Sequence, residues 1–130
     1  MYELVNSMKT AASGMQAQGF RLRLVGENIA NADTPGYHRK VVSFNSEMDR
    51  ATGASRVTPG PVTLDQTEPR ETFDPGHPLA NEKGIRTLSN VNTLIEIADA
   101  REAQRSYQTN ISIFDQARKM HASTLEILRR

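Results

Sequence analysis

The sequence contains no cysteine and no tryptophan, and aromatic residues make up only 5% of its 130 residues. Without cysteine, neither a disulfide framework nor a thiolate metal site can form. The mean hydropathy is negative, and few large apolar side chains are present to fill an independent core. Because a chain of this size buries a modest fraction of its surface when it folds alone, its composition favours further burial against a partner.

Charge and hydropathy exclude several classes of partner. Sixteen lysines and arginines against fifteen aspartates and glutamates give a net charge of +1, which provides no general attraction to nucleic acid or anionic lipid. No run approaches the ~20 apolar residues that a membrane-spanning helix needs, so we expect no direct membrane insertion. The first residues lack a basic region followed by an apolar stretch, which predicts that no cleaved secretory signal is used.

Proline and glycine divide the chain into three parts. All six prolines lie between Pro35 and Pro78, and residues 90–130 contain neither proline nor glycine. Because proline breaks helices and glycine weakens them, this distribution predicts a helix over 1–32, an irregular connecting segment over 33–89 and a second helix over 90–130. The expected fold class is therefore mainly α.

The N-terminal part carries a narrow apolar stripe with alternating steps of three and four residues, which is typical of a helix that packs on another helix. This N-terminal stripe consists of Met1, Leu4, Met8, Ala11, Met15, Gln18, Leu22, Val25 and Ile29. Beside it, small residues recur every seven positions at Ala12, Gly19 and Gly26. Another backbone could approach along this flank, although the same residues are also ordinary weak helix positions.

The C-terminal part repeats the pattern. Its apolar stripe consists of Ile97, Ala100, Gln104, Tyr107, Ile111, Phe114, Arg118, His121, Leu125 and Leu128. Two such helices at opposite ends of one chain predict an antiparallel coiled coil, with Ile111 and Phe114 facing inward. At ~1.5 Å per residue each helix reaches roughly 45 to 60 Å, so the molecule should be elongated. Val5, Ile113 and Ile127 lie off both stripes and favour contacts between subunits.

The connecting segment alternates β-prone runs with turn-forming residues. The runs cover residues 40–44, 61–64 and 84–88, and turn signals at 58–61 and 74–76 separate them. This pattern predicts a small β-hairpin or a three-stranded element within an otherwise irregular segment.

Candidate chemistry is concentrated in residues 73–84. Asp74, His77 and Glu82 are residue types that bind metals or transfer protons. They are spaced among prolines and glycines in a loop, whereas a metal site needs ligands held on rigid elements. The sequence has no Ser/His/Asp constellation and no phosphate-binding glycine loop. We therefore predict a structural turn here, with no catalytic residue, no metal site and no cofactor.

Three blocks of sequence resemble the family of flagellar rod and hook subunits. The first is an asparagine-containing helix end followed by Thr-Pro-Gly-Tyr, formed by Asn28, Asn31, Thr34, Pro35, Gly36 and Tyr37. Its physical sense is a helix that ends near Asn31 and a glycine that can supply a positive φ. The second block is Asp74, Pro75, Gly76, His77 and Pro78. The third joins Asn90 and Asn92 to Tyr107, Gln108 and Asn110. In this order the blocks are most similar to proximal rod subunits of the basal body.

This resemblance implies a structural role without enzyme activity. Such subunits leave the cell unfolded through the flagellar type III export channel and assemble helically into the periplasmic rod, which transmits torque and encloses that channel. The implied partners are other rod subunits, copies of the chain itself, and the base of the basal body on the side of the MS ring and export apparatus.

The resemblance also implies roles for individual residues. The paired terminal helices would form an inner layer around the channel, and the connecting segment would form an outer layer. Asn90 and Asn92 would cap the second helix. Packing and hydrogen bonds between the helices would come from Tyr107, Gln108 and Asn110.

Other functions fit parts of the sequence. A nucleic-acid-binding helical hairpin would use Arg21, Arg23, the run 38–40 and the pair 129–130, but stacking aromatics are not interleaved with these cations. A metal-dependent hydrolase would use the loop 74–82. Another axial subunit of the same organelle is the third alternative, and the second sequence block argues against it.

Overall fold

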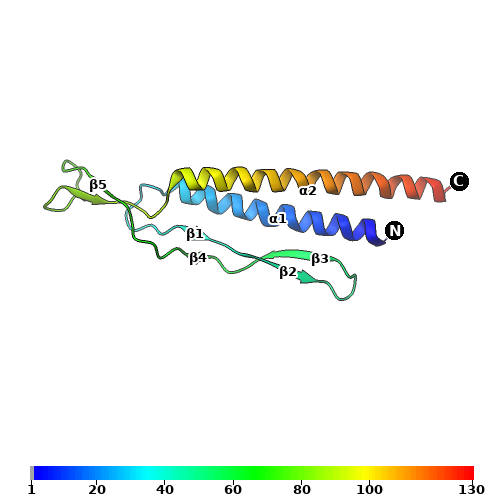
Figure 1. The fold of residues 1–130 in the computed structure, drawn as a ribbon. Helices are drawn as coiled ribbons and strands as arrows, with labels where there is room; N and C mark the ends of the chain where they lie inside the picture. Colours follow the sequence, from blue (N-terminus) through cyan, green and yellow to red (C-terminus); the bar gives the residue numbers. More distant parts are fainter. Residues whose placement is uncertain (1) are drawn as a thin grey trace.

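The computed structural model describes residues 2–130, which form two long helices and three pairs of short strands (Figure 1). Helix α1 spans Tyr2–Ala30 and helix α2 spans Thr93–Leu128, so about half of the chain is helical. The strands are β1 (Lys40–Val41), β2 (Phe44–Met48), β3 (Ser55–Pro59), β4 (Thr63–Leu64), β5 (Glu71–Phe73) and β6 (Ile85–Thr87). The predicted pair of terminal helices joined by a segment with short strands is confirmed. Met1, the first residue of the N-terminal stripe, lies outside the described residues.

Local side-chain chemistry sets the inner ends of both helices. Helix α1 ends at Ala30, and the Asn31 side chain donates a hydrogen bond of 2.9 Å to the carbonyl of Glu27 in the last turn. Gly36 then has a φ of +77°, as the Thr-Pro-Gly-Tyr motif predicts. Helix α2 begins where the Asn92 side chain accepts from the backbone N–H of Leu94 at 3.1 Å, which satisfies one free donor of the first turn.

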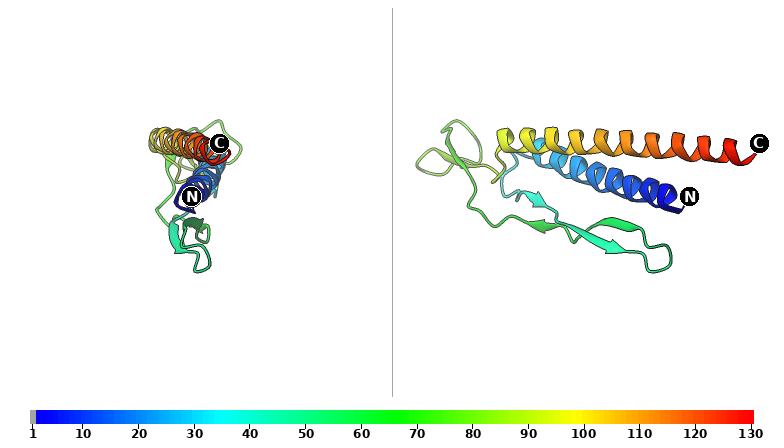
Figure 2. Two further views of the ribbon diagram at one scale, coloured as in Figure 1. Left: turned by 90° about the vertical axis from the view of Figure 1, so that its right-hand side faces the viewer. Right: turned by 45° about the vertical axis from the view of Figure 1, so that its right-hand side comes forward.

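Residues 40–64 form one long interrupted hairpin, the long hairpin, in which β1 pairs with β4 and β2 pairs with β3, both antiparallel. It lies along α1, where the Ser13 hydroxyl accepts from the backbone N–H of Val57 at 3.0 Å and the Thr10 hydroxyl donates to the carbonyl of Ser55 at 2.6 Å. Seen end on, α1 lies between α2 and the long hairpin (Figure 2). The far side of α2 is therefore not covered by the strands.

The second hairpin joins β5 and β6 and projects beyond the end of the helices at which α2 begins (Figure 1). The remainder of the molecule is elongated, with the N-terminus of α1 and the C-terminus of α2 at the opposite end. The last turns of α2 extend beyond the start of α1. Neither helix contains a stretch long and apolar enough to cross a membrane.

The face that α1 turns towards α2 is smaller and more polar than its apolar stripe predicted. Ala11 and Val25 of that stripe are buried, as expected, but Gly14 and Asn28 are also buried, whereas Ile29 is 37% exposed. A Cβ placed on Gly14 would lie 2.7 Å from the Asn110 side chain of α2, so the two helices approach closely at this glycine.

The prediction for the C-terminal stripe is wrong at every second position. Ile97, Ile111 and Leu125 are 40%, 44% and 41% exposed, so Ile111 does not face α1 as predicted. The inward positions each lie one residue before a position of the stripe. Among them Glu96, Ala103 and Ala117 are buried, and Asn110 packs against Gly14. Two of these inward residues are polar. Glu96 accepts a hydrogen bond from Asn28 of α1, and Asn110 has space because Gly14 of α1 carries no side chain.

The apolar core is correspondingly thin. Its buried members are mostly alanines, with a few larger aliphatic residues, and they are Ala11, Ala17, Leu24, Val25, Ala32, Ala54, Leu88, Val91, Ala103 and Ala117. More than half of the large apolar residues that are exposed lie on α2.

Candidate functional site

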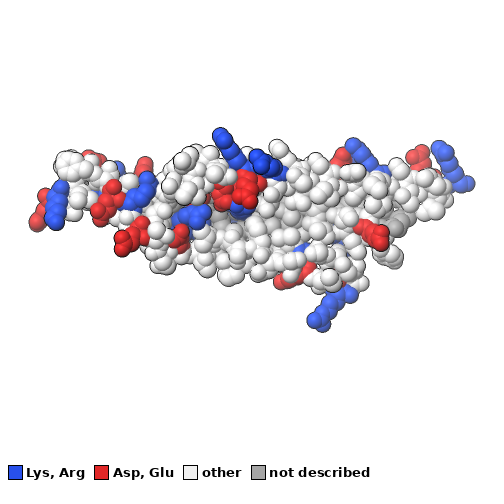
Figure 3. Space-filling view, in the orientation of Figure 1, with Lys and Arg blue, Asp and Glu red and all other residues white. Residues whose placement is uncertain are grey.

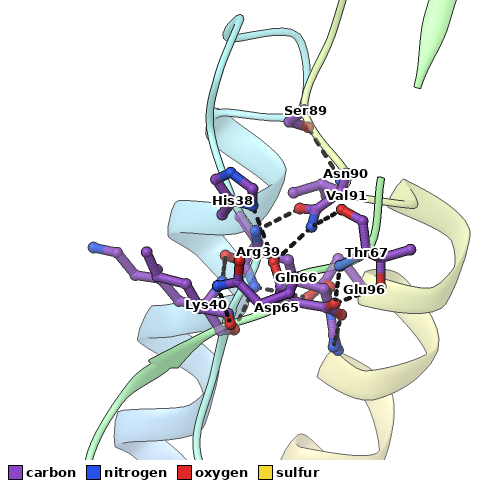
Figure 4. Close-up of polar contacts among 12 residues, drawn as sticks. His38, Arg39, Lys40, Asp65, Gln66, Thr67, Ser89, Asn90, Val91 and Glu96 are labelled. Atoms are coloured by element: carbon purple, nitrogen blue, oxygen red, sulfur yellow. Dashed lines mark hydrogen bonds and ion pairs between the residues drawn. The ribbon is translucent and has the colours of Figure 1, made fainter. Parts of the chain in front are cut away.

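A buried polar cluster lies where the end of α1, the start of α2 and the long hairpin meet (Figure 4). We call it the junction cluster and define it by Asn28, Tyr37, Arg39, Asn90 and Glu96. Asn28 comes from the last turns of α1 and Glu96 from the first turn of α2. Tyr37 and Arg39 precede β1, and Asn90 precedes α2. The cluster therefore connects three parts of the chain that are remote in sequence.

Asn28 is the centre of the junction cluster and is 1% exposed. Its side-chain nitrogen donates to the carbonyl of Lys40 at 3.0 Å and to the Glu96 carboxylate at 3.3 Å. Its side-chain oxygen accepts from the backbone N–H of Lys40 at 2.9 Å and from the Tyr37 hydroxyl at 2.8 Å. All four hydrogen-bonding positions of the carboxamide are thus filled, and the side chain pairs with Lys40 as a neighbouring strand would.

Glu96 is 0% exposed and accepts a charge-assisted hydrogen bond from the Nε atom of Arg39. Its other carboxylate oxygen accepts from Asn28. Burial of a carboxylate is costly unless a cation and further hydrogen bonds compensate it. The position of Arg39 before β1 is therefore fixed by a group on α2.

Asn90 connects the start of α2 to the residues that flank the long hairpin on both sides. Its oxygen accepts from the backbone N–H of Arg39 at 2.6 Å, and its nitrogen donates to the carbonyls of Asp65 and Thr67 at 2.9 and 3.0 Å. Asn90 therefore does not cap α2 as predicted; of the pair, Asn92 alone does so.

Ser89 continues the connection on the other side of the cluster. It is 0% exposed, and its hydroxyl donates to the carbonyl of Ala32 at 2.5 Å and accepts from the backbone N–H of Val91 at 3.1 Å. The loop after α1 is thereby joined to the segment that leads into α2.

The charged groups around the cluster compensate one another. A hydrogen bond from the Thr67 hydroxyl is the main cause that holds the pKa of Asp65 below its ordinary value, and Arg39 contributes. The Glu27 carboxylate, which accepts from Lys40 at 3.0 Å, raises the pKa of that lysine. Burial raises the pKa of Tyr37, so its phenol stays protonated and donates to Asn28.

A hollow of about 280 Å³ lies beside the cluster, between α1, the long hairpin and α2, and it is lined in part by Arg21, Arg39, Lys40, Glu96 and Asp99. Arg21 forms an ion pair with Asp99, and Arg39 forms one with Glu96. Because these charges are paired with each other, the arrangement supports a fixed connection between elements better than proton transfer or ligand binding.

The second sequence block lies away from the junction cluster, in the loop of the β5–β6 hairpin. The backbone N–H of His77 donates to the carbonyl of Asp74 at 3.1 Å, and the His77 Nδ1 atom accepts from the backbone N–H of Leu79 at 3.1 Å. Gly84 has a φ of +74°. Across residues 2–130, no three His, Asp or Glu side chains are grouped closely enough to hold a metal ion.

The remaining predicted site residues lie along the helices and the loop after α1. Within this set Thr34 donates to the Asn31 side chain at 3.2 Å, and Pro35 and Gly36 are exposed. Tyr107 and Phe114 are half-buried, Gln108 is exposed, and Asn110 packs against Gly14.

Sequence reasoning missed Glu96, Arg39 and Ser89. A glutamate in the first turn of a helix is usually a solvated residue that interacts with the helix dipole, so Glu96 gave no sign of its burial. The local sequence gives no signal of this burial, because the partners Asn28 and Arg39 lie 68 and 57 residues away from Glu96 in the chain.

Comparisons with known proteins agree with this architecture. A family described as flagella basal body rod protein matches residues 8–38, and the C-terminal family of flagellar basal body rod FlgEFG proteins matches residues 85–127. The flagellar basal-body rod protein FlgC of Agrobacterium fabrum is 44% identical, with 99% of this chain and 98% of the relative covered. FlgC of Escherichia coli O6:H1 is 33% identical and FlgC of Salmonella typhimurium is 32% identical, each with 95% of this chain and 97% of the relative covered.

Proposed function

Because the chain belongs to the FlgC family of flagellar basal-body rod proteins and is a structural subunit of that rod, we propose that α1 and α2 form an antiparallel coiled coil on the inner side of the rod, around the export channel. The long hairpin and the β5–β6 hairpin then form the outer layer. The relatives are structural rod proteins, and they associate with other rod components in the basal body. For this chain the rod is periplasmic, and the subunit reaches it through the flagellar type III export channel.

One observation carries this proposal: most of the large apolar side chains of α2 are exposed rather than buried against α1. Ile113, Met120 and Ile127 are 46%, 51% and 71% exposed and lie on one flank of α2, seven residues apart. Ile111 and Leu125 lie on the other flank. Exposed apolar rows of this kind mark interfaces. Figure 3 shows that much of the face over the helix pair is free of charged side chains, which suits close packing between subunits.

The junction cluster gives the subunit a fixed shape for assembly. Asn28 and Tyr37 from the first sequence block, together with Asn90, hold the long hairpin at a set position on the helices. Asn31, Thr34, Pro35 and Gly36 form the turn that makes this position possible. The turn at 74–78 shapes the projecting hairpin. The partners are other rod subunits, further copies of this chain, and the base of the basal body.

The internal ion pairs of the subunit disfavour the alternative function as a nucleic-acid-binding helical hairpin. Arg21, Arg39 and Lys40 are all engaged in internal ion pairs, with Asp99, Glu96 and Glu27. Cations that are held by carboxylates of the same chain do not form a basic binding surface.

The test compares two substitutions on α2. Ile111→Asp places a carboxylate on an apolar flank that is 44% exposed in the subunit, so the chain still folds and is exported, but a contact repeated in every copy is lost. Gln116→Asp is the matched control, because Gln116 is exposed on a different side of α2. We expect non-motile cells without hooks for Ile111→Asp and near-normal swimming for Gln116→Asp. Normal rods in electron micrographs of Ile111→Asp basal bodies would contradict the proposed contact.

A further inference from the structure

Among residues 2–130, the β5–β6 hairpin packs on neither of the two helices (Figure 1). Glu71 pairs with Thr87 and Phe73 pairs with Ile85 across its two short strands, and an isolated two-stranded hairpin is marginally stable in water. Two of its large apolar side chains are nevertheless uncovered, since Phe73 is 73% exposed and Leu79 is 63% exposed. The hairpin therefore presents an apolar surface that its own chain leaves unburied.

This hairpin has one defined face. Successive side chains of a strand point to opposite sides, so Glu71 and Phe73 lie on the same side of β5. A Cβ placed on Gly84 would lie 3.0 Å from the Phe73 ring, so the ring packs closely against the backbone of Gly84. Neither Glu71 nor Glu82, in the adjoining loop, forms an ion pair with any residue between 2 and 130. The hairpin and its loop therefore carry two exposed apolar side chains and two carboxylates without an ion-pair partner among residues 2–130.

A complementary surface lies on the first turns of α2. This α2 groove is a hollow of about 630 Å³ lined by Leu94, Ile97, Ala98, Arg101, Glu102 and Arg105. Leu94 is 76% exposed. Arg101 and Arg105 are exposed and have no ion-pair partner within the described part of the chain. From Leu94 to Arg105 the helix rises ~16 Å, which is comparable with the length of a short hairpin.

We propose that the β5–β6 hairpin of one copy docks into the α2 groove of a second copy, an inference that rests on the proposed rod assembly. Phe73 and Leu79 would cover Leu94 and Ile97, while the two carboxylates would pair with Arg101 and Arg105. Such polar complementarity sets the register of an interface.

The placement of the two surfaces favours contact between copies. The hairpin projects beyond the end of the helices at which α2 begins (Figures 1 and 2). Both surfaces lie at the same end of the molecule, so copies that stand side by side bring them together. The contact joins two different patches, and a contact of that type repeats around a ring or along a helix.

Cross-linking in assembled basal bodies tests the contact. The chain has no cysteine, so in a variant with Leu79→Cys and Ile97→Cys the introduced residues are the only thiols that this chain can contribute to a disulfide. The matched control carries Leu79→Cys and Gln116→Cys, with the second cysteine on α2 but outside the groove. We expect basal bodies of the first variant to contain covalently linked copies and those of the control to contain few or none. Equal levels, or a Leu79→Cys adduct to a different rod subunit, would overturn the inference.

Charge-reversal variants in the same cross-linking assay provide a second test of the contact. Arg101→Glu with Arg105→Glu should lower the linked fraction about tenfold, because like charges then face each other. Adding Glu71→Arg and Glu82→Arg should restore most of it, and a failure to restore it would overturn the assigned pairing. Basal bodies that contain the chain without any link would refute only the hairpin contact, whereas rods that lack the chain altogether would also refute the proposed function.

Discussion

Arg39 and Glu96 form a buried ion pair, and we expect removal of Arg39 to lower the stability of the protein more than removal of Glu96. Replacement of Arg39 by alanine leaves a carboxylate that is 0% exposed with only the Asn28 amide as a partner. Replacement of Glu96 by alanine leaves a guanidinium that is 23% exposed and that has the Asp65 carboxylate 3.8 Å away. The remaining arginine can therefore be solvated or paired, but the remaining glutamate cannot.

The magnitudes follow from this difference. Breaking a buried pair by removing one partner costs about 3 to 5 kcal/mol when the other charge is left buried, and we expect Arg39→Ala to lie in that range. For Glu96→Ala we expect about 1 to 3 kcal/mol, because the cost is mainly lost packing and hydrogen bonds. The double variant Arg39→Met, Glu96→Leu removes both charges and keeps much of the volume, so it should be more stable than Arg39→Ala.

Urea unfolding of the purified protein, followed by far-UV circular dichroism, measures these differences. Arg50→Ala serves as the control, since Arg50 is exposed at the tip of the long hairpin and its removal should change stability by less than about 0.5 kcal/mol. The reasoning would be refuted if Glu96→Ala were as destabilising as Arg39→Ala, or if the double variant were the least stable of the three.

Two further predictions concern helix packing and acid stability. Gly14→Leu should destabilise the protein by about 1 to 3 kcal/mol through overpacking against Asn110. In contrast, Gly19→Leu should stabilise the monomer by about 0.8 kcal/mol through helix propensity, because nothing lies within 4 Å of a Cβ at that position. Equal midpoints of the two variants in thermal unfolding would contradict this contrast. The lowered pKa of Asp65, caused first by the Thr67 hydroxyl, adds stability that is present above its ordinary value of 3.8 and lost as the pH falls through the lowered value. Thr67→Val should therefore move the acid unfolding midpoint to higher pH in a circular dichroism titration, and an unchanged midpoint would rule this linkage out.

The helices and their ends could be predicted because their signals are local. Proline and glycine are excluded from the C-terminal part and the prolines gather in the middle, and these residues act on the backbone of their own segment. Asn92 and Gly36 likewise act within a few residues of their own position, the first as a cap and the second through a φ of +77°. The connecting segment was predicted to hold one hairpin or three-stranded element, and its strands instead form three separate pairs.

The side of each helix that faces its neighbour was less predictable. An apolar stripe assigned by steps of three and four assumes that the inward side is the more apolar one. Here that assumption fails by one residue at alternate positions, with Gly14 inward in place of Met15 and Asn110 inward in place of Ile111. Apolar residues that serve contacts between subunits cannot be distinguished, in a single sequence, from those that serve contacts within one.

The junction cluster depended on non-local information. Asn28 was part of a recognised motif, but its partners Lys40 and Glu96 are 12 and 68 residues away in the chain. Glu96 alone resembles an ordinary first-turn glutamate, and Arg39 alone resembles a basic surface residue. Their roles follow only from the fold that brings them together.

The polar contacts between α1 and α2 define their register more strongly than an apolar interface would. Gly14 faces Asn110, Arg21 pairs with Asp99, and Asn28 contacts Glu96. If α2 slipped by one heptad so that Asn28 faced Ala103, Arg21 would lose its carboxylate and Glu96 would lie beyond the end of α1. The buried groups of Asn28 and Glu96 and the half-buried guanidinium of Arg21 would then lack their partners. The specific register is thus maintained by polar groups that add little net stability, and the apolar flanks of α2 stay free for neighbours. Burial that most proteins obtain in their own core must then come from assembly, so the stability of the helix pair should rise when the subunit enters the rod.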